Sequence, residues 1–351
     1  MNNSQRIIRH LLIGLLIAGA ITGCGIFSTD DDQSNDEVET RATFILCEGN
    51  FGSNNSSLWQ ISTELTTAAG NVFQSLTGTP LGDTGQSLTV DDNRLYIVMN
   101  GSNAVEVIER TDSILHYAGR IDLAGAGPRE MVVQDSTGYV TCWYINAVLA
   151  VNLSTLAVTD TIFVPGMPED ILAYEGVLYV ALPLQTGWSN HDEVVRIDPV
   201  TSTITATYVV GNGPQQLAVF NNEIYVSRQW YDATYTSYRG VAQIDPGNGQ
   251  VVTKDWGAGS GVDIISADGM LYLATGSGVQ PLKADLTLDD ESMIGAGVAN
   301  QYAAGSDSNR IFIASSDFVN PGLIQVYNTQ NDSLGQFIVG INPGAFAFFR
   351  E

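Results

Sequence analysis

The sequence predicts an all-β fold, a closed ring of seven four-stranded antiparallel blades, and three observations carry this prediction. A unit of four short strand-like segments recurs along the chain at intervals of 39–47 residues, a spacing typical of β-propellers. After residue 40 no long segment has a helical pattern, and only 15% of the residues of the whole chain are charged. The two chain ends also complement each other, because the first unit lacks a strand that the last residues supply.

The unit is clearest in residues 168–213. Its four segments alternate apolar with polar residues or carry β-branched runs, at residues 170–174, 177–182, 193–198 and 203–210. Turn signals separate them at Glu175-Gly176, Asp198-Pro199 and Gly211-Asn212-Gly213-Pro214. We expect four antiparallel strands in an up-and-down meander. One such sheet needs copies of itself on both sides to bury its faces.

The copies are visible in the turn before the first strand, which recurs seven times, and in the core of the second strand. The turns begin at Gly85, Pro128, Pro168, Pro214, Gly261, Asn300 and Pro343. Second-strand copies include Leu95-Tyr96-Ile97-Val98, Leu178-Tyr179-Val180-Ala181 and Leu271-Tyr272-Leu273-Ala274. These residues resemble the YVTN-type, YncE-like β-propeller repeat, and Tyr139-Val140-Thr141-Cys142 is nearest to the family's name. The resemblance covers nearly all of the chain after residue 40 and implies a fold rather than a function.

The chain ends predict how the ring closes. Residues 42–82 offer a second, third and fourth strand at Thr43–Cys47, Ser57–Ile61 and Asn71–Leu76, but no first strand. Residues 343–349 supply a first strand with nothing after it. We therefore expect the C-terminal strand to complete the N-terminal blade, which closes the ring at seven blades and leaves no open sheet edge.

Residues 1–23 have the features of a signal peptide. Arg6 and Arg9 precede an apolar run that is short for a bilayer span. The ending Ile21-Thr22-Gly23-Cys24 resembles the lipobox of bacterial lipoproteins, which implies lipid on Cys24 and a membrane anchor. An ordinary secretory peptide is the alternative. Residues 24–40 are polar and acidic, so we expect a disordered tether. An acidic run here resembles the surface-export signal of some outer-membrane lipoproteins, which leaves both the surface and the periplasm open.

Residues 41–351 are expected to form one domain, because each blade needs its neighbours. Without Arg6 and Arg9 the chain has 12 basic and 38 acidic side chains, a formal net charge of −26. This charge disfavours nucleic acid and anionic membrane surfaces as partners, so only the N-terminal lipid is expected to reach a membrane. Cys47 and Cys142 fall a whole blade apart and are expected to be free, buried thiols.

Binding is expected on the face where the loops between second and third strands meet the connections between blades. Aromatic and arginine side chains, which are typical of binding hot spots, are concentrated in these loops. The expected ligand-binding residues are Trp143 and Tyr144 in blade 3, Trp188 and His191 in the loop of residues 183–192, and Arg228, Trp230, Tyr231, Tyr235, Tyr238 and Arg239 in the loop of residues 228–239. The alternative is that they cover the blade edge, with Arg stacked on Tyr.

The turns into the first strands add acids and amides around the central channel. Those expected to contact a ligand are Arg129, Glu130, Asp170, Gln215 and Gln216, and Gln86, Glu169, Asp263 and Gln301 share this rim. As a set they suit an amide-rich or hydroxyl-rich ligand. Singly, each is a candidate for capping a neighbouring turn or holding channel water.

Neither catalysis nor a cofactor or metal is expected. His10 lies in the signal, His116 lies near a turn of blade 2, and only His191 reaches the loop face, so a multi-His metal site is not available. No convincing set of nucleophile and base is present either. Paired carboxylates such as Glu130 with Glu169 or Asp170 keep a glycan-active hydrolase or lyase open as an alternative.

The segment Phe44-Ile45-Leu46-Cys47-Glu48-Gly49-Asn50-Phe51-Gly52 resembles the opening blade of surface lipoprotein propellers, some of which capture cobalamin for an outer-membrane transporter. The resemblance implies a corrinoid or similar large neutral ligand, with a TonB-dependent outer-membrane transporter as partner. Our main hypothesis is a lipid-anchored, non-enzymatic ligand-binding protein of the cell envelope. A protein-interaction scaffold, with blades 4 and 5 as its docking patch, is the alternative.

Overall fold

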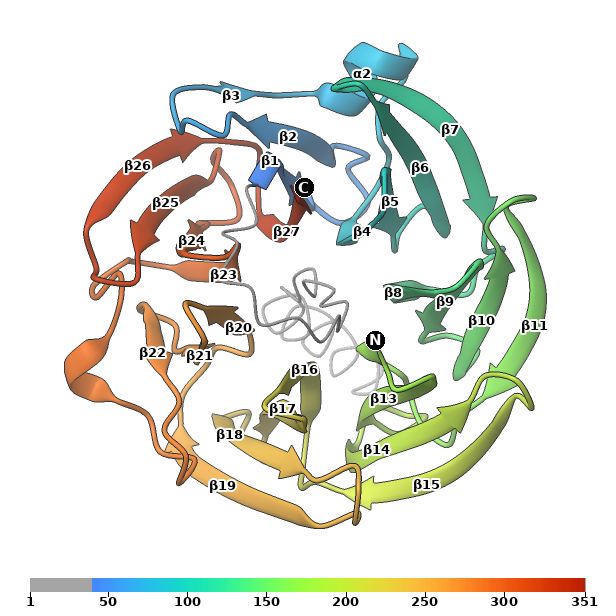
Figure 1. Ribbon diagram of the computed structural model, residues 1–351, viewed down its shortest axis with the longest axis vertical. Helices are drawn as coiled ribbons and strands as arrows, with labels where there is room; N and C mark the ends of the chain where they lie inside the picture. The colour runs from blue at the N-terminus through green and yellow to red at the C-terminus, as the bar shows by residue number, and fades with distance from the viewer. Residues whose placement is uncertain (1–39, 351) are drawn as a thin grey trace, which may run out of the picture.

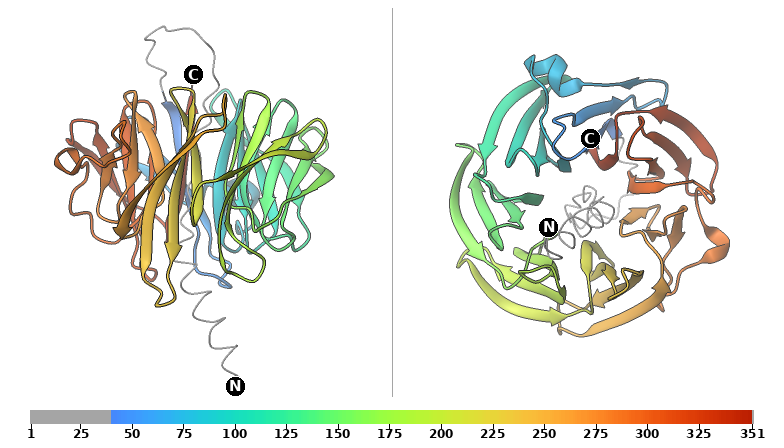
Figure 2. Two further views of the ribbon diagram at one scale, coloured as in Figure 1. Left: turned by 90° about the horizontal axis from the view of Figure 1, so that it is seen from below. Right: turned by 180° about the vertical axis from the view of Figure 1, so that it is seen from behind.

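A computed structural model describes residues 40–350, which form seven β-sheets arranged as the blades of a ring. Figure 1 looks down the ring axis, and the edge-on view of Figure 2 shows the blades standing side by side around it. The expected signal peptide, Cys24 and acidic tether lie outside the described residues. Within residues 40–350 no helix is long and apolar enough to cross a membrane.

Each blade is an antiparallel meander whose first strand is innermost (Figure 1). Blade 1 contains β27 (Pro343–Arg350), β1 (Thr40–Cys47), β2 (Ser57–Ile61) and β3 (Ala68–Ala69), and blade 2 contains β4 (Gly85–Asp91), β5 (Arg94–Met99), β6 (Ala104–Thr111) and β7 (Ile114–Asp122). Blade 3 contains β8 (Pro128–Gln134), β9 (Thr137–Cys142), β10 (Ala147–Asn152) and β11 (Ala157–Phe163), and blade 4 contains β12 (Ile171–Tyr174), β13 (Val177–Leu184), β14 (Asn190–Asp198) and β15 (Thr203–Val209). Blade 5 contains β16 (Pro214–Phe220), β17 (Glu223–Tyr231), β18 (Ser237–Ile244) and β19 (Val251–Ala258). Blade 6 contains β20 (Ile264–Ala267), β21 (Met270–Ala274) and β22 (Val279–Pro281), and blade 7 contains β23 (Gln301–Ser306), β24 (Arg310–Ser315), β25 (Leu323–Asn328) and β26 (Ser333–Ile338).

The predicted ring of seven blades and its closure are confirmed. The C-terminal strand β27 pairs antiparallel with β1, and Phe346 lies opposite Ile45 in the register. The order of strands in this sheet is β27, β1, β2 and β3, so the last strand of the chain is the first strand of blade 1. Both edges that the chain ends would otherwise leave open are thereby paired.

Two blades depart from the predicted four full strands. The expected fourth strand of blade 1, Asn71–Leu76, is wrong, because this segment forms the short helix α2 (Val72–Thr77) and the fourth strand is only the two-residue β3. Blade 6 has three strands, and the 3-10 turn η1 (Asp290–Ser292) follows where a fourth strand was expected. Phe73 of α2 is buried, and its ring lies edge-on to Tyr117 at 5.7 Å, so the helix covers the boundary between blades 1 and 2.

The core lies between the blades. Each buried cluster joins the facing sides of two neighbouring sheets, as where Tyr96 and Val98 of blade 2 pack with Val140 and Leu149 of blade 3. The recurring tyrosine of the second strand is fully buried in three blades, at Tyr96, Tyr179 and Tyr272. The two described cysteines are free and buried, as predicted. No blade can therefore keep its core without the next one.

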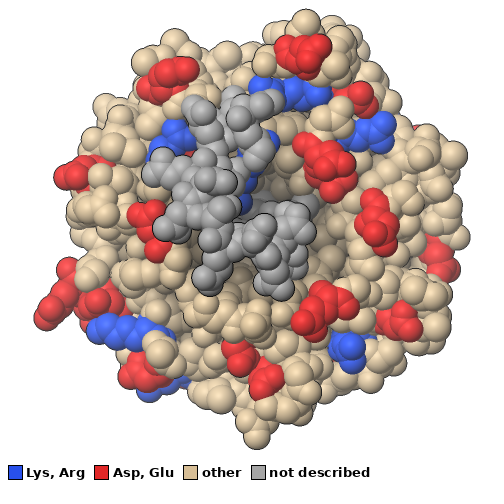
Figure 3. Space-filling view, viewed as in Figure 1, with Lys and Arg blue, Asp and Glu red and all other residues tan. Residues whose placement is uncertain are grey.

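The turns match the residues that form them. Tyr174 pairs with Val177, so Glu175 and Gly176 are the two residues of a tight hairpin, and both have positive φ, 51° and 76°. Such a turn favours glycine, because glycine has no Cβ and adopts positive φ without a steric clash. Acidic side chains are spread around the ring on the face seen in Figure 3, with basic side chains among them.

Candidate functional site

The aromatic segment of blade 5 is a hairpin rather than the predicted loop. Residues 228–231 belong to β17 and residues 237–239 belong to β18, so only residues 232–236 form the connection. His191 likewise lies in β14 and not in a loop, because β14 begins at Asn190. Strand pairing continues two to four residues further than sequence alternation indicates, which places these side chains on extended backbone.

The blade 5 side chains contact one another. The guanidinium of Arg228 is buried, forms an ion pair with Asp255 at 2.7 Å, and lies 4.8 Å from the centre of the Trp230 ring. The Trp230 ring stacks on Tyr238 with centroids 5.9 Å apart. This arrangement is close to the alternative stated for the sequence, in which these side chains cover the blade edge and an arginine stacks on a tyrosine. Here the arginine lies over Trp230 instead. Tyr235 stands apart, and 59% of its surface is exposed.

A second group gathers around Arg129, at the start of the innermost strand of blade 3. Its Nε and Nη2 donate to Glu169 of blade 4 at 2.9 and 2.6 Å, and its Nη1 donates to Gln86 of blade 2. The Trp143 ring lies 4.0 Å from the guanidinium carbon, and Trp188 contacts Trp143 edge-on at 5.6 Å. The structure thus brings predicted residues from three neighbouring blades into one cluster.

Glu130 is a buried acid beside this cluster whose hydrogen bonding is incomplete. Its side chain is buried, and Oε1 has no hydrogen-bond partner among residues 40–350. Burial raises the pKa of this carboxyl well above its usual range, and the negative charges of Asp170 and Glu169 raise it further. This shift extends the protonated form to higher pH than usual, and a neutral carboxyl can both donate and accept a hydrogen bond.

Other members of the predicted polar rim bond groups within their own blade or join one blade to the next. Asp170 Oδ2 accepts the Leu217 N–H at 2.6 Å, while its Oδ1 accepts the N–H of Ile171 at 2.7 Å. Gln216 Oε1 accepts the Ile264 N–H at 3.0 Å, and Asp263 Oδ2 accepts the Ala304 N–H at 2.8 Å. The Nε2 groups of Gln215 and Gln216 donate to Gln229 O and Asp263 Oδ1, each at 3.3 Å. These contacts are the turn-capping alternative that the sequence left open.

Sequence reasoning missed a second buried acid, Glu48, which follows β1. Its Oε2 accepts the Tyr302 hydroxyl at 2.8 Å, and its Oε1 has no partner in the described part of the chain. A Cβ on Gly344 would stand 2.2 Å from that oxygen, so only glycine leaves room for it. A signal was present, because Tyr302 occupies the repeat position that is Glu, Asp or Gln in blades 3 to 6.

These acids predict that the ring loses stability as the pH rises from 5 to 8. Burial raises the pKa of Glu48 to about 8 and that of Asp170 to about 7. In the unfolded chain these groups ionise near pH 4, so above that pH unfolding releases protons. The stabilisation that they give below pH 4 is therefore lost as the pH rises toward their pKa values in the folded chain. We expect the melting temperature to fall by about 5 °C between pH 5 and pH 8.

Scanning calorimetry across this range checks the expectation. Glu48→Gln keeps an acceptor for Tyr302 and cannot ionise, so its melting temperature should depend less on pH. The matched control is Glu64→Gln, because Glu64 is exposed and lies in the turn between β2 and β3. Equal slopes for the parent and the Glu48 variant would contradict the assignment.

Solved structures with this architecture are known. The chain superposes on a candidate 6-phosphogluconolactonase from Bacteroides fragilis with a TM-score of 0.65 and 15% identity, covering 91% of this chain and 100% of the other. It superposes on apo AztD from Citrobacter koseri with a TM-score of 0.56 and 11% identity, covering 89% and 98%. It also superposes on Kuenenia stuttgartiensis hydrazine synthase with a TM-score of 0.63 and 15% identity, covering 88% and 100%.

At such identities these likenesses show the fold alone. Neither a protein-family model nor a curated protein matches the chain. The protein is a seven-bladed β-propeller, and its function has to be argued from its own side chains.

Proposed function

We propose that this protein is a non-enzymatic ligand-binding propeller whose site is the cluster around Arg129 and Glu130, between blades 3 and 4. The observation that carries the proposal is the buried Glu130 carboxyl with an unpartnered oxygen, because a buried polar group without a partner costs about 1–3 kcal/mol. A ligand that supplies the missing hydrogen bond recovers this free energy on binding.

The surroundings of Glu130 support a ligand with a flat or apolar part. Trp143 stacks on the Arg129 guanidinium, Trp188 packs against Trp143, and Tyr144 beside them is exposed over 57% of its surface. Arg129 is already engaged by Glu169, so it presents little free charge to a ligand. Together with the neutral form of Glu130, this favours an uncharged ligand rich in amides or hydroxyls over an anion.

Binding is favoured over hydrolysis because the second carboxylate that a hydrolase needs is not free. Both oxygens of Asp170 accept backbone N–H groups, and Glu169 is held by Arg129. A general base must be able to reach and release a proton. Glu130 is left as a single acid without an available partner carboxylate.

The wider setting of the proposal comes from the sequence resemblances. Lipid on Cys24 would hold the propeller at the cell envelope, where the bound ligand is passed to a TonB-dependent outer-membrane transporter. A corrinoid is the ligand that the opening segment indicates, and one of its peripheral amides would supply the hydrogen bond that the Glu130 carboxyl lacks. Membrane fractionation of a Cys24→Ser variant tests the anchor. We expect the variant to leave the membrane fraction, and a variant that stays in the membrane like the parent would contradict anchoring through Cys24.

The binding proposal is tested by calorimetric titration of the full-length protein with cyanocobalamin at micromolar concentration. We expect saturable binding that Glu130→Leu weakens by about 5–100-fold, since leucine has nearly the size of the acid but no group that can form the hydrogen bond. Trp143→Ala should weaken it by about 30-fold or more, as for an aromatic hot spot. Glu64→Gln serves as the matched control with unchanged affinity, because Glu64 is exposed in the turn between β2 and β3.

Two results would overturn parts of the proposal. If cyanocobalamin gives no heat while neutral oligosaccharides or amide ligands bind in a Glu130-dependent way, the corrinoid is excluded and the site stands. If a glycan substrate is turned over by the parent and by Glu64→Gln but not by Glu130→Gln, the protein is a hydrolase or lyase instead.

A further inference from the structure

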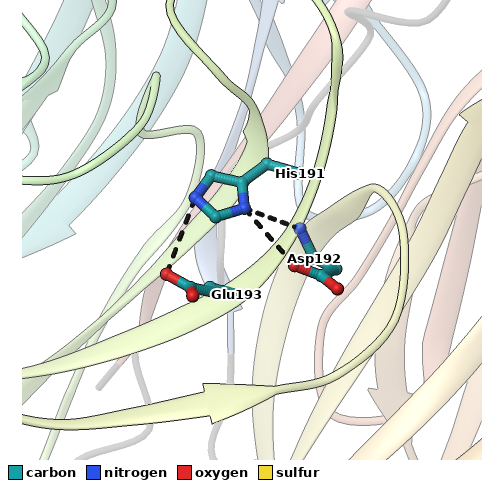
Figure 4. Close-up of side chains that lie close together, drawn as sticks. All are labelled: His191, Asp192 and Glu193. Atoms are coloured by element: carbon teal, nitrogen blue, oxygen red, sulfur yellow. Dashed lines mark hydrogen bonds and ion pairs between the residues drawn. The ribbon is translucent and has the colours of Figure 1, made fainter.

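We propose that His191 and Glu193 bind one divalent d-block cation of the zinc class at the start of β14 in blade 4. The ligand atoms of His191, Asp192 and Glu193 all lie within 4.8 Å of one another. Figure 4 shows the imidazole between the two carboxylates. This inference is independent of the ligand proposed for Glu130.

The spacing of the two ligands suits one ion. Residues two apart on a strand project to the same side, which places His191 and Glu193 together. Nε2 of His191 lies 3.6 Å from Oε2 of Glu193. Two ligands about 2.1 Å from a metal and this far apart subtend about 118° at it, close to the tetrahedral angle of about 109° that zinc prefers. Little movement is therefore needed to place an ion between them.

The third residue supplies the partner that a metal-bound histidine needs. In the structure Nδ1 of His191 accepts the backbone N–H of Asp192 at 3.0 Å, and Oδ1 of Asp192 lies 3.4 Å from this Nδ1. A metal on Nε2 requires the imidazole proton on Nδ1, so the hydrogen bond that Nδ1 accepts from the Asp192 N–H is exchanged for one that it donates to Oδ1 of Asp192. A carboxylate on the far nitrogen of the ring orients the imidazole and increases its basicity toward the metal.

The backbone around these residues holds the site in place. The carbonyls of His191 and Asp192 accept the N–H groups of Gly213 and Val210, each at 2.8 Å, so the strand is tied to the connection leading into blade 5. A Cβ on Gly166 would lie 2.7 Å from Cδ2 of His191 and 3.4 Å from its Nε2, so this glycine leaves space beside the nitrogen. The imidazole is almost fully buried, whereas 26% of the Glu193 side chain is exposed.

The donor set selects the class of ion. Imidazole with carboxylate suits zinc, nickel, copper or cobalt, whereas calcium and magnesium take oxygen ligands. Two protein ligands leave the remaining coordination positions to water. The two adjacent acids give the site net negative charge, which attracts a divalent cation.

The test is titration of tag-free, chelator-treated full-length protein with Zn²⁺ by calorimetry and with Co²⁺ by visible absorption. We expect one ion per chain and the intense absorption of low-coordinate Co²⁺. His191→Ala should abolish binding and Glu193→Gln should weaken it at least tenfold. Asp192→Asn should weaken it by about 10–100-fold, the effect of losing an outer hydrogen-bond partner. His116→Ala is the matched control, because His116 is exposed in β7 of blade 2.

Circular dichroism of each variant separates loss of binding from loss of fold. If His191→Ala does not fold, the Glu193 and Asp192 variants decide the question, because both substitutions keep the side-chain shape. The proposal is overturned if one equivalent of Zn²⁺ or Co²⁺ gives no heat and no absorption change. It is equally overturned if binding survives unchanged in Glu193→Gln.

Discussion

Deleting residues 343–351 is expected to unfold the whole ring rather than blade 1 alone. The deletion removes β27, which pairs with β1 and packs against β4 of blade 2 and β23 of blade 7. Phe346 and Phe349 are buried. The centroid of the Phe346 ring lies 6.1 Å from that of Phe312, and the centroid of the Phe349 ring lies 5.8 Å from that of Phe44. Losing one buried phenylalanine costs about 3–5 kcal/mol, so losing both removes most of a typical folding free energy of about 5–15 kcal/mol.

Soluble yield and thermal unfolding by circular dichroism measure this effect. We expect the truncated chain to be insoluble or to lack a cooperative transition, because the exposed edge of β1 also invites aggregation. The graded control is Phe346→Ala in the full-length chain, which keeps the strand pairing and should lower stability by about 3–5 kcal/mol. A soluble, monomeric truncation that melts like the parent would contradict the role given to β27.

The fold was predictable because the signals that specify it are local and repeated. Each of these signals is contained in a short segment. They are the alternation of apolar residues, the two-residue turns such as Glu175-Gly176, and the recurring second strand. The failure at Asn71–Leu76 has a local cause as well. Val72, Phe73 and Leu76 are spaced as on one side of a helix, and a segment this short satisfies both periodicities.

The candidate sites were predictable only in composition. The rim of acids and amides and the aromatic loops followed from the repeat, but the contacts that define them join distant segments. Glu169 lies 40 residues from Arg129, and Tyr302 lies 254 residues from Glu48. Which pairs meet depends on the closed ring. The sequence therefore could not distinguish the free oxygen of Glu130 from the satisfied oxygens of Asp170.

Replacing Arg129 by methionine is expected to lower the free energy of unfolding by about 3–5 kcal/mol, because it leaves the Glu169 carboxylate buried and unpaired. The guanidinium donates to both oxygens of this carboxylate, from Nε at 2.9 and 3.1 Å and from Nη2 at 2.6 Å, and the Glu169 side chain is 1% exposed. Arg129→Lys should recover little of the loss, since an ammonium cannot form the same fork of hydrogen bonds.

The double variant Arg129→Met with Glu169→Gln separates the cost of the orphaned charge from the worth of the pair. We expect it to be more stable than Arg129→Met alone, because no charge is left in the buried site. Chemical denaturation of the four chains gives the coupling free energy. The control pair is Lys283 with Asp289, whose lysine is 52% exposed, and Lys283→Met should cost less than about 1 kcal/mol.

The dependence of this loss on pH provides an independent check. Burial raises the pKa of Glu169, and Arg129 opposes that rise by its charge and its hydrogen bonds. Without the guanidinium the carboxyl should protonate at a higher pH, so the penalty of Arg129→Met should shrink as the pH falls from 8 toward 5. A penalty that stays constant over this range would mean that Arg129 stabilises the ring through its stacking on Trp143 and not through the charge of Glu169.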